Sequence, residues 1–423
     1  MTRFSLAPLW TALLLYFCLT AALIVVVPFN GAPDEAAHAQ YIEGIAATHA
    51  LPVFQGQAPP NPGYEFHQPP LFYLLAAPLW SLTGAGVQLY AARALSLVFG
   101  LLSIWVVWKT ALLVFGRDSH APTFCVLGAA LSPLHQGVGA SINNDALAGL
   151  WAACLFYLVA QAWLIGAPRR IVVLVGVVAG LGALTKLTAL PLGVWALVCV
   201  GLALSKQGKR PLTELMPALS IALLLSAPML IRNQNLYGDP LAYGLFSRAA
   251  AGVSPGLALF SQVIGVGGYA RGMALQMIGT AFGFWGGSSS FARVVGTFSP
   301  SGPRFPSPLW SLPFLLVVAL PLLGLWSARR TLADATQGAN RSALWKCWAV
   351  GALLVALLWL SFAIAHVAGG QARYLHAALV PLTLLLGGAL SATKRAGTLA
   401  ALLLALVMIG MTLANIFVWK TLV

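Results

Sequence analysis

One apolar segment governs the topology of this chain: Leu71-Phe72-Tyr73-Leu74-Leu75-Ala76-Ala77-Pro78-Leu79-Trp80-Ser81-Leu82. A helix needs roughly 20 apolar residues to cross a bilayer. This segment is too short for that, and Pro78 interrupts it. We therefore expect Leu71–Leu82 to form a helix that lies in the membrane interface without crossing. A crossing, the alternative, would move every later loop to the opposite side of the membrane.

The composition of the 423-residue chain predicts an all-α polytopic membrane protein. Hydrophobic residues make up 60% of the chain and charged residues 8%, against roughly 25% charged residues in an ordinary soluble domain. Lipid must therefore surround most of the surface. No stretch is polar enough for a separate domain, and the chain ends at Val423 directly after its last apolar segment. We expect residues 1–423 to form one transmembrane domain with no soluble C-terminal domain.

The other apolar segments predict about eleven transmembrane helices. They are Ala7–Val27, Leu89–Phe115, Ala121–Val138, Ala146–Ile165, Ile171–Leu187, Leu190–Leu204, Pro211–Ile231, Pro308–Trp326, Leu344–Ala365, Leu375–Leu390 and Ala396–Val418. The stretch from Ile171 to Leu204 is long for one crossing and short for two. Pro191 and the polar residues Thr185 to Thr188 predict two short helices that meet at a break there.

The basic residues lie in short clusters between the apolar segments, and they account for the net charge of +14. With Arg3 inside and Leu71–Leu82 in the interface, these clusters fall on the cytoplasmic side, as the positive-inside rule requires. The charge is thus a topology signal, and we expect no nucleic-acid partner. Two large external loops follow from this topology, at residues 28–88 and 232–307, and most acidic residues lie outside.

The first external loop begins with Asn30-Gly31-Ala32-Pro33-Asp34-Glu35-Ala36-Ala37-His38. Pro33 and the alanine-rich run predict a helix whose N-terminus carries Asp34 and Glu35. Asp34 and His38 are four residues apart, so they share one face of that helix. The two carboxylates have two interpretations. They are either a helix cap beside the membrane or a general base for a membrane-borne substrate.

A second cluster in the same loop is Tyr64-Glu65-Phe66-His67-Gln68-Pro69-Pro70. The two prolines favour extended backbone, which holds Glu65 and His67 beside the interfacial helix. An aromatic belt at the membrane surface accounts for the aromatic residues of this cluster, but not for Glu65 and His67. The sequence around Glu65 and His67 thus leaves these two polar residues without a structural explanation.

Three further charged residues lie at the external ends of predicted spans: Asp145, Lys186 and Arg373. Asp145 has a second interpretation as the cap of the span Ala146–Ile165. Lys186 either extends to the lipid headgroups or binds an anion. Arg373 follows the turn Gly369-Gly370-Gln371-Ala372, and a glycine-rich turn before an arginine suits a phosphate. Together with the carboxylates of the first loop, these charges predict a site for attack on an anionic lipid phosphate.

The order of these motifs resembles the GT-C superfamily of polyprenyl-phosphate-sugar transferases, which includes the protein O-mannosyltransferases and the lipid A aminoarabinose transferase. The motif sequences are most similar to those of bacterial membrane proteins with a Pro-Asp-Glu-x-x-His motif. The matching pieces span nearly the whole chain: Pro33-Asp34-Glu35-Ala36-Ala37-His38, His67-Gln68-Pro69-Pro70-Leu71-Phe72-Tyr73, Asn144-Asp145-Ala146-Leu147, Leu184-Thr185-Lys186, Arg232-Asn233, Leu236-Tyr237-Gly238-Asp239-Pro240, Phe284-Trp285-Gly286 and Arg373-Tyr374. Many members continue into a soluble external C-terminal domain, and this chain departs from them there.

The resemblance implies a role for each candidate residue. Asp34 would be the catalytic base, with Glu35 as its neighbour and Asp145 as the second acidic residue of the site. The carrier phosphate would be held by Lys186, Arg373 and Tyr374.

Some relatives bind a divalent metal ion through residues of the first loop, and the candidate ligands here are His38, Glu65 and His67. Polar contact at the interface is the alternative for the histidines, because no diagnostic ligand spacing is present. No other cofactor is implied.

The function implied by the resemblance is that of an inverting glycosyltransferase at the external, periplasmic face of a bacterial inner membrane. Its partners would be a polyprenyl-phosphate-linked sugar donor, membrane lipids, and an acceptor that is a glycan, a lipid or a protein. A secondary transporter or lipid flippase is the alternative, and it predicts charges near the bilayer midplane and two related halves. A non-catalytic subunit with the same fold is a third possibility, against which the intact acidic pair argues.

Overall fold

The computed structural model describes residues 6–58, 61–251, 262, 265–270, 273, 277, 338–365, 371–392 and 394–422. This part of the chain is helical and contains no β-strand, which confirms the predicted all-α polytopic fold. Within it, eight helical stretches are long and apolar enough to cross a membrane. The predicted span Pro308–Trp326 and the motif Phe284-Trp285-Gly286 lie outside the described residues, so eleven spans stays a prediction.

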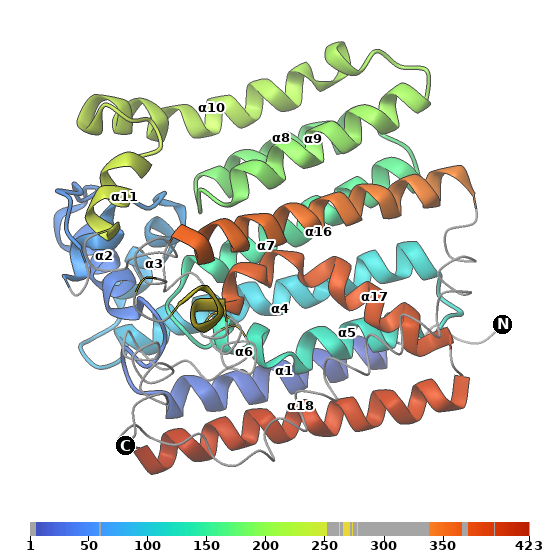
Figure 1. Cartoon of the computed structure of the whole chain (residues 1–423), viewed down its shortest axis with the longest axis horizontal. Helices are drawn as coiled ribbons and strands as arrows, with labels where there is room; N and C mark the ends of the chain where they lie inside the picture. The colour runs from blue at the N-terminus through green and yellow to red at the C-terminus, as the bar shows by residue number, and fades with distance from the viewer. Residues whose placement is uncertain are drawn as a thin grey trace.

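The helices follow one another along the chain with short connections. Their bounds are α1 Ala7–Val26, α2 Glu35–Thr48, η1 Pro62–His67, α3 Leu71–Leu82, α4 Gln88–Phe115, α5 Ala121–Leu131, α6 Pro133–Gly139, α7 Asn144–Leu164, α8 Arg169–Ala183, α9 Ala189–Lys206, α10 Pro211–Tyr237, α11 Tyr243–Ala251, α16 Ala339–Ala365, η4 Ala372–Ala378, α17 Leu379–Ala392 and α18 Lys394–Leu422. The long helices run side by side, and the short elements α2, α3 and α11 gather at one end (Figure 1).

The short helix α3 has the predicted bounds and does not cross the bundle. Arg93, near the start of α4, donates hydrogen bonds to the carbonyl oxygens of Ile24 and Val27 at the end of α1, over 2.8 and 2.7 Å. The chain therefore leaves α1 and enters α4 at the same end of the bundle. The amide of Leu71 donates to the carbonyl oxygen of Leu184 over 2.8 Å, which ties α3 to the connection between α8 and α9.

One predicted span is interrupted in the structure, and one predicted break is present. The segment Ala121–Val138 is not one helix, because α5 ends before Ser132 and α6 begins at Pro133. Proline cannot donate the hydrogen bond that would continue α5, and Ser132 caps the new helix by accepting from the amide of His135. The predicted break within Ile171–Leu204 is confirmed: α8 and α9 are separated by residues 184–188.

Small residues let α8 approach α10 closely. A Cβ atom at Gly176 would lie 2.4 Å from the carbonyl oxygen of Ala218, so only glycine fits at this crossing. Without a hydrophobic drive between helices in lipid, such close contact is a main source of stability. This packing matters for the site because the connection at the end of α8 carries Lys186.

Candidate active site

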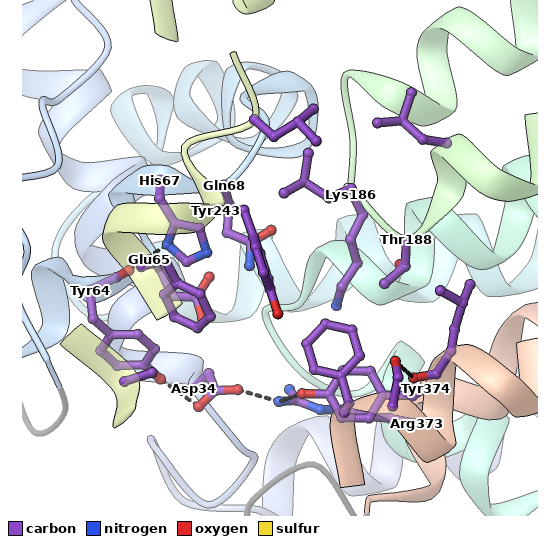
Figure 2. Close-up of a pocket in the computed structure, with 18 of the residues that line it drawn as sticks. Asp34, Tyr64, Glu65, His67, Gln68, Lys186, Thr188, Tyr243, Arg373 and Tyr374 are labelled. Atoms are coloured by element: carbon purple, nitrogen blue, oxygen red, sulfur yellow. Dashed lines mark hydrogen bonds and ion pairs between the residues drawn. The ribbon is translucent and has the colours of Figure 1, made fainter. Parts of the chain in front are cut away.

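A cavity of about 500 Å³ opens among the elements gathered at one end of the bundle. It is lined from the loop before α2, from α2 and η1, from the α8–α9 connection, from α11, from α16 and from η4. Seven of the predicted site residues line it together: Asp34, His38, Glu65, His67, Lys186, Arg373 and Tyr374. Figure 2 shows side chains from these separate elements converging on one space.

Asp34 lines this cavity and lies between a hydroxyl and a cation. Its backbone has φ 62°, in the left-handed region that a non-glycine residue rarely adopts. One carboxylate oxygen accepts a hydrogen bond from the Tyr64 hydroxyl, and the other forms an ion pair with the Arg373 guanidinium (Figure 2). Burial alone would raise the pKa of Asp34, but Arg373 and Tyr64 outweigh it and lower the pKa to about 2.

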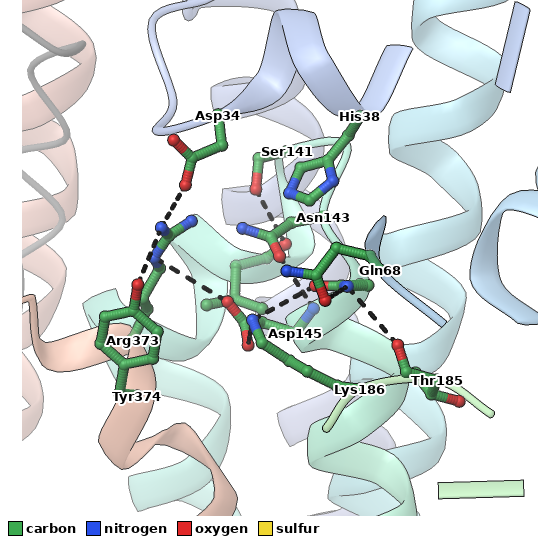
Figure 3. Close-up of polar contacts among 12 residues, drawn as sticks. Asp34, His38, Gln68, Ser141, Asn143, Asp145, Thr185, Lys186, Arg373 and Tyr374 are labelled. Atoms are coloured by element: carbon green, nitrogen blue, oxygen red, sulfur yellow. Dashed lines mark hydrogen bonds and ion pairs between the residues drawn. The ribbon is translucent and has the colours of Figure 1, made fainter. Parts of the chain in front are cut away.

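Asp145 joins the site from the first turn of α7 and is buried. One of its oxygens lies 2.5 Å from the Lys186 ammonium, and the other lies 3.9 Å from Nε of Arg373. The alternative role of Asp145 as a helix cap is wrong, because the side chain of Asn143 is the cap and accepts from the Asp145 amide over 2.8 Å. Asp145 is therefore available to hold both cations in place (Figure 3).

The two cations share an aromatic surface. Nζ of Lys186 lies 5.6 Å and Cζ of Arg373 lies 5.2 Å from the centre of the Tyr374 ring. Phe362 of α16 stacks on Tyr374 with ring centres 5.2 Å apart. Lys186 is only 8% exposed, so it does not extend to the headgroups. The turn residues Gly369 and Gly370, predicted to shape a phosphate site here, lie outside the described residues.

Glu35 lies apart from the cavity, although it is adjacent to Asp34 in sequence. It is fully buried and accepts two hydrogen bonds from Arg93, each 2.7 Å long. Its oxygens also accept from the amides of Asn30 and Ile142 over 3.0 and 3.1 Å. These contacts join the loop of Asp34 to the loop before α7, so the position of Glu35 suits a residue that holds the two loops together.

Glu65 and His67 line the far side of the cavity from Lys186. Glu65 is 5% exposed, and its Oε2 atom has no hydrogen-bond partner within the described part of the chain. Burial and the nearby Asp34 carboxylate raise the pKa of Glu65 to about 8. Nδ1 of His67 donates to the carbonyl oxygen of Tyr64 over 2.7 Å, and its ring stacks on Phe246 of α11. Burial lowers the pKa of His67 to about 4.

Replacing Glu65 with glutamine should change how stability depends on pH. Because the folded-state pKa of about 8 lies above the unfolded value of 4.5, the folded protein binds the proton more tightly. The wild-type stability from this group is therefore complete below pH 4.5 and declines as the pH rises to about 8. The melting temperatures of Glu65→Gln and wild type are measured in detergent. We expect the melting temperature of the variant, relative to that of wild type, to increase as the pH rises from 5 to 8. A difference that stays constant over this range would contradict the raised pKa.

Three residues of the site were not singled out by the sequence: Tyr64, Arg93 and Asn144. Arg93 carries a usable signal, since a charged residue within an apolar span is rare. Tyr64 and Asn144 carry none, because a tyrosine near a membrane surface and an asparagine at a helix start are both common for other reasons.

The fold is similar to that of solved glycan-transferring membrane enzymes. A superposition on the apo crystal structure of the oligosaccharyltransferase from Archaeoglobus fulgidus gives a TM-score of 0.56 at 14% identity, covering 99% of this chain and 57% of that chain. The chain has the GT-C fold. Residues 67–231 match the family described as Dolichyl-phosphate-mannose-protein mannosyltransferase. The match covers less than half of the chain, so it is the predicted GT-C fold that is confirmed.

Two further structures of the Archaeoglobus fulgidus oligosaccharyltransferase are similar to this chain. The complex with Zn and sulfate has a TM-score of 0.55 at 15% identity, over 97% of this chain and 53% of that chain. The complex of AglB with an inhibitory peptide and a dolichol-phosphate has a TM-score of 0.50 at 16% identity, over 97% and 56%. This chain thus spans just over half the length of these relatives. No curated protein sequence matches it.

The predicted metal ligands do not form a metal site in the part of the chain that the structure describes. No three histidine, cysteine, aspartate or glutamate side chains converge there as a metal ion requires. The donor set therefore does not fit a divalent ion, and the chemistry below uses only protein groups.

Proposed function

We propose that this chain transfers a sugar from a polyprenyl-phosphate carrier to an acceptor hydroxyl at the external face of a bacterial inner membrane. The observation that carries the proposal is the cavity that the Asp34 carboxylate lines together with two buried cations, Lys186 and Arg373. A base for the acceptor and positive charge for the leaving phosphate are the two requirements of this reaction. The GT-C fold and the bound dolichol-phosphate of AglB support the choice of donor.

The lining of the cavity suits such a donor. Apolar side chains beside Lys186, from α9 and α16, face the same space as the charged groups: Leu190, Pro191, Leu358 and Phe362. They offer a surface to the first isoprene units while the phosphate lies between Lys186 and Arg373. Guanidinium and ammonium groups both bind phosphate oxygens, the first with two parallel hydrogen bonds.

The proposed reaction is a single displacement. The acceptor hydroxyl loses its proton to Asp34, and its oxygen forms a bond to the anomeric carbon of the sugar. The bond from that carbon to the phosphate oxygen breaks, and the electron pair stays on the phosphate beside Lys186 and Arg373. A single displacement inverts the configuration of the anomeric carbon.

Binding of the sugar donor would also raise the pKa of Asp34 and make it a better base. Arg373 is paired with Asp34 and holds its pKa low, so the carboxylate is a weak base. A phosphate that draws the guanidinium toward itself weakens this pair. The pKa of Asp34 then rises toward the range in which a carboxylate accepts a proton more readily.

The position of the charges argues against a transporter. Asp145 begins α7, Lys186 lies between α8 and α9, and Arg373 begins the helical stretch before α17. They occupy the ends of helices, whereas the transporter alternative expects charges near the bilayer midplane.

Two measurements test the proposal. Purified full-length protein in lipid nanodiscs should convert labelled polyprenyl-phosphate sugars, made from a panel of nucleotide sugars, into a glycosylated acceptor in a membrane extract. Mass analysis of surface glycans and lipids from a deletion strain should show one glycan lacking a sugar and accumulation of its carrier. Unchanged glycans and lipids, together with uptake of label into proteoliposomes without a covalent product, would favour transport instead.

A further inference from the structure

His38 lines the cavity but is bonded through only one of its ring nitrogens. The residue lies on α2, one turn after Asp34, and is 2% exposed. Its Nδ1 atom is 2.9 Å from the Tyr73 hydroxyl of α3. Its Nε2 atom forms no hydrogen bond within the described chain, and this leaves Nε2 as the nitrogen available to the cavity. In Figure 3 the ring of His38 points from α2 toward the cluster around Asp145 and Lys186.

The direction of the hydrogen bonds behind His38 is set by Lys186. An ammonium group can only donate, so the Asn144 atom 3.2 Å from Nζ of Lys186 must be the amide oxygen. The amide nitrogen of Asn144 then faces the other way. Its two hydrogens face three acceptors: the Gln68 side-chain oxygen and the Tyr73 hydroxyl oxygen, each at 3.4 Å, and the Thr185 carbonyl oxygen at 3.5 Å. Asn144 is fully buried, so no solvent competes for these contacts.

The same reasoning determines the direction of the Tyr73 hydroxyl hydrogen and then the tautomer of His38. Within the described residues, two groups lie within hydrogen-bond distance of the Tyr73 oxygen: the amide nitrogen of Asn144, which can only donate, and Nδ1 of His38, which can accept. The single hydroxyl hydrogen of Tyr73 therefore points to His38. Nδ1 of His38 is therefore the acceptor, and the ring proton lies on Nε2. Burial lowers the pKa of His38 to about 3, so the ring is neutral near pH 7.

We propose that His38 is a substrate-binding residue that donates a hydrogen bond from Nε2 to an oxygen of the bound donor. This inference rests on the proposed function and deepens it. Tyr73 and Asn144 are positioning residues, since they act only by holding the tautomer of His38. In this tautomer Nε2 has no lone pair for a metal ion, so the arrangement also argues against His38 as a ligand.

A neutral imidazole that donates a hydrogen bond suits the charges around His38. The ring lies in the field of two carboxylates and two cations: Asp34, Asp145, Lys186 and Arg373. A charged imidazole would compete with Arg373 for the Asp34 carboxylate, whereas a neutral N–H leaves both ion pairs intact. Neutral histidine serves in the same way as a hydrogen-bond donor to a developing negative charge in other enzymes. The oxygen it contacts belongs either to the carrier phosphate or to the sugar.

A pair of substitutions distinguishes the two ring nitrogens. The amide nitrogen of glutamine reaches about as far as Nε2, and that of asparagine reaches only as far as Nδ1. We expect His38→Gln to keep kcat/KM for the sugar donor within about tenfold of wild type. His38→Asn should lower this kcat/KM by about 10- to 100-fold, the usual effect of one hydrogen bond to a charged group. Equal loss in both variants, or no loss in either, would overturn the proposal.

A binding measurement with farnesyl phosphate, which carries no sugar, shows whether Nε2 of His38 contacts an oxygen of the phosphate or of the sugar. If His38→Asn weakens the affinity for farnesyl phosphate relative to His38→Gln, the partner is a phosphate oxygen. If the affinity is unchanged and only kcat/KM for the sugar donor falls, the partner is a sugar oxygen. Both results support the donor role of Nε2.

The tautomer can be observed without any activity, which separates this inference from the proposed function. Solid-state NMR on protein with ¹⁵N-labelled histidine, with His38→Gln used to assign the signal, should show a protonated Nε2 and an unprotonated Nδ1. Tyr73→Phe should release the ring into a mixture of tautomers. Tyr41→Phe is the matched control, since Tyr41 stacks on Tyr73 at 3.9 Å but bonds to Gln68 instead. A protonated Nδ1 in the wild-type protein would refute the inference even if sugar transfer is confirmed.

Discussion

Replacing Asp34 with asparagine is expected to abolish sugar transfer while the protein still inserts and folds. Asparagine has nearly the same shape and can still accept from the Tyr64 hydroxyl, but it cannot take a proton from the acceptor. Loss of a general base typically costs about 10²- to 10⁴-fold in rate. The measurement is transfer from a labelled polyprenyl-phosphate sugar in nanodiscs, with kcat and KM determined separately. The fall should appear in kcat.

The matched control is Glu43→Gln, which removes an exposed carboxylate from the same helix α2. This variant should transfer sugar at the wild-type rate. The melting temperature and gel-filtration profile of Asp34→Asn should show that it is folded. Full activity in a folded Asp34→Asn protein would exclude Asp34 as the base and direct attention to Glu65, whose Oε2 atom has no hydrogen-bond partner among the described residues.

Replacing Arg93 with leucine is expected to cause the largest loss of stability. The guanidinium binds both oxygens of Glu35, the two groups are 1% and 0% exposed, and it also donates to the carbonyl oxygens of Ile24, Val27 and Pro28. Removing one partner of a buried ion pair leaves the other charge uncompensated, which costs about 3–5 kcal/mol. Thermal unfolding in detergent, followed by tryptophan fluorescence, measures this loss.

A double substitution separates the ion pair from simple packing. If the unpaired Glu35 charge causes the loss in Arg93→Leu, then Glu35→Gln combined with Arg93→Leu should be more stable than Arg93→Leu alone. Both variants should also weaken sugar transfer, because Glu35 connects the loop of Asp34 to Ile142 near Asp145. Additive losses in the double variant would show that the two residues act independently.

Features that depend on local length, charge and spacing could be predicted from the sequence. The bounds of α3 were predicted residue for residue, because Pro69 and Pro70 determine where the helix begins and too few apolar residues follow for a crossing. The shared location of Asp34, Lys186 and Arg373 at one end of the bundle follows from counting spans. That Asp34 and His38 face one cavity follows from their spacing of four residues.

The sequence by itself thus determined the helical membrane fold, its topology around α3, and which end of the bundle carries the charged site. Only the tertiary structure decided the partners of each charge. Asp34 and Glu35 are adjacent and chemically alike, yet one faces the cavity and the other is bonded to Arg93, 58 residues away. Asn143 caps α7 in place of Asp145, and Tyr73 sets the tautomer of His38. Bilayer thickness and residue spacing act within a short stretch of chain, whereas the pairing of buried polar groups depends on which distant side chains the packed helices bring within hydrogen-bond distance.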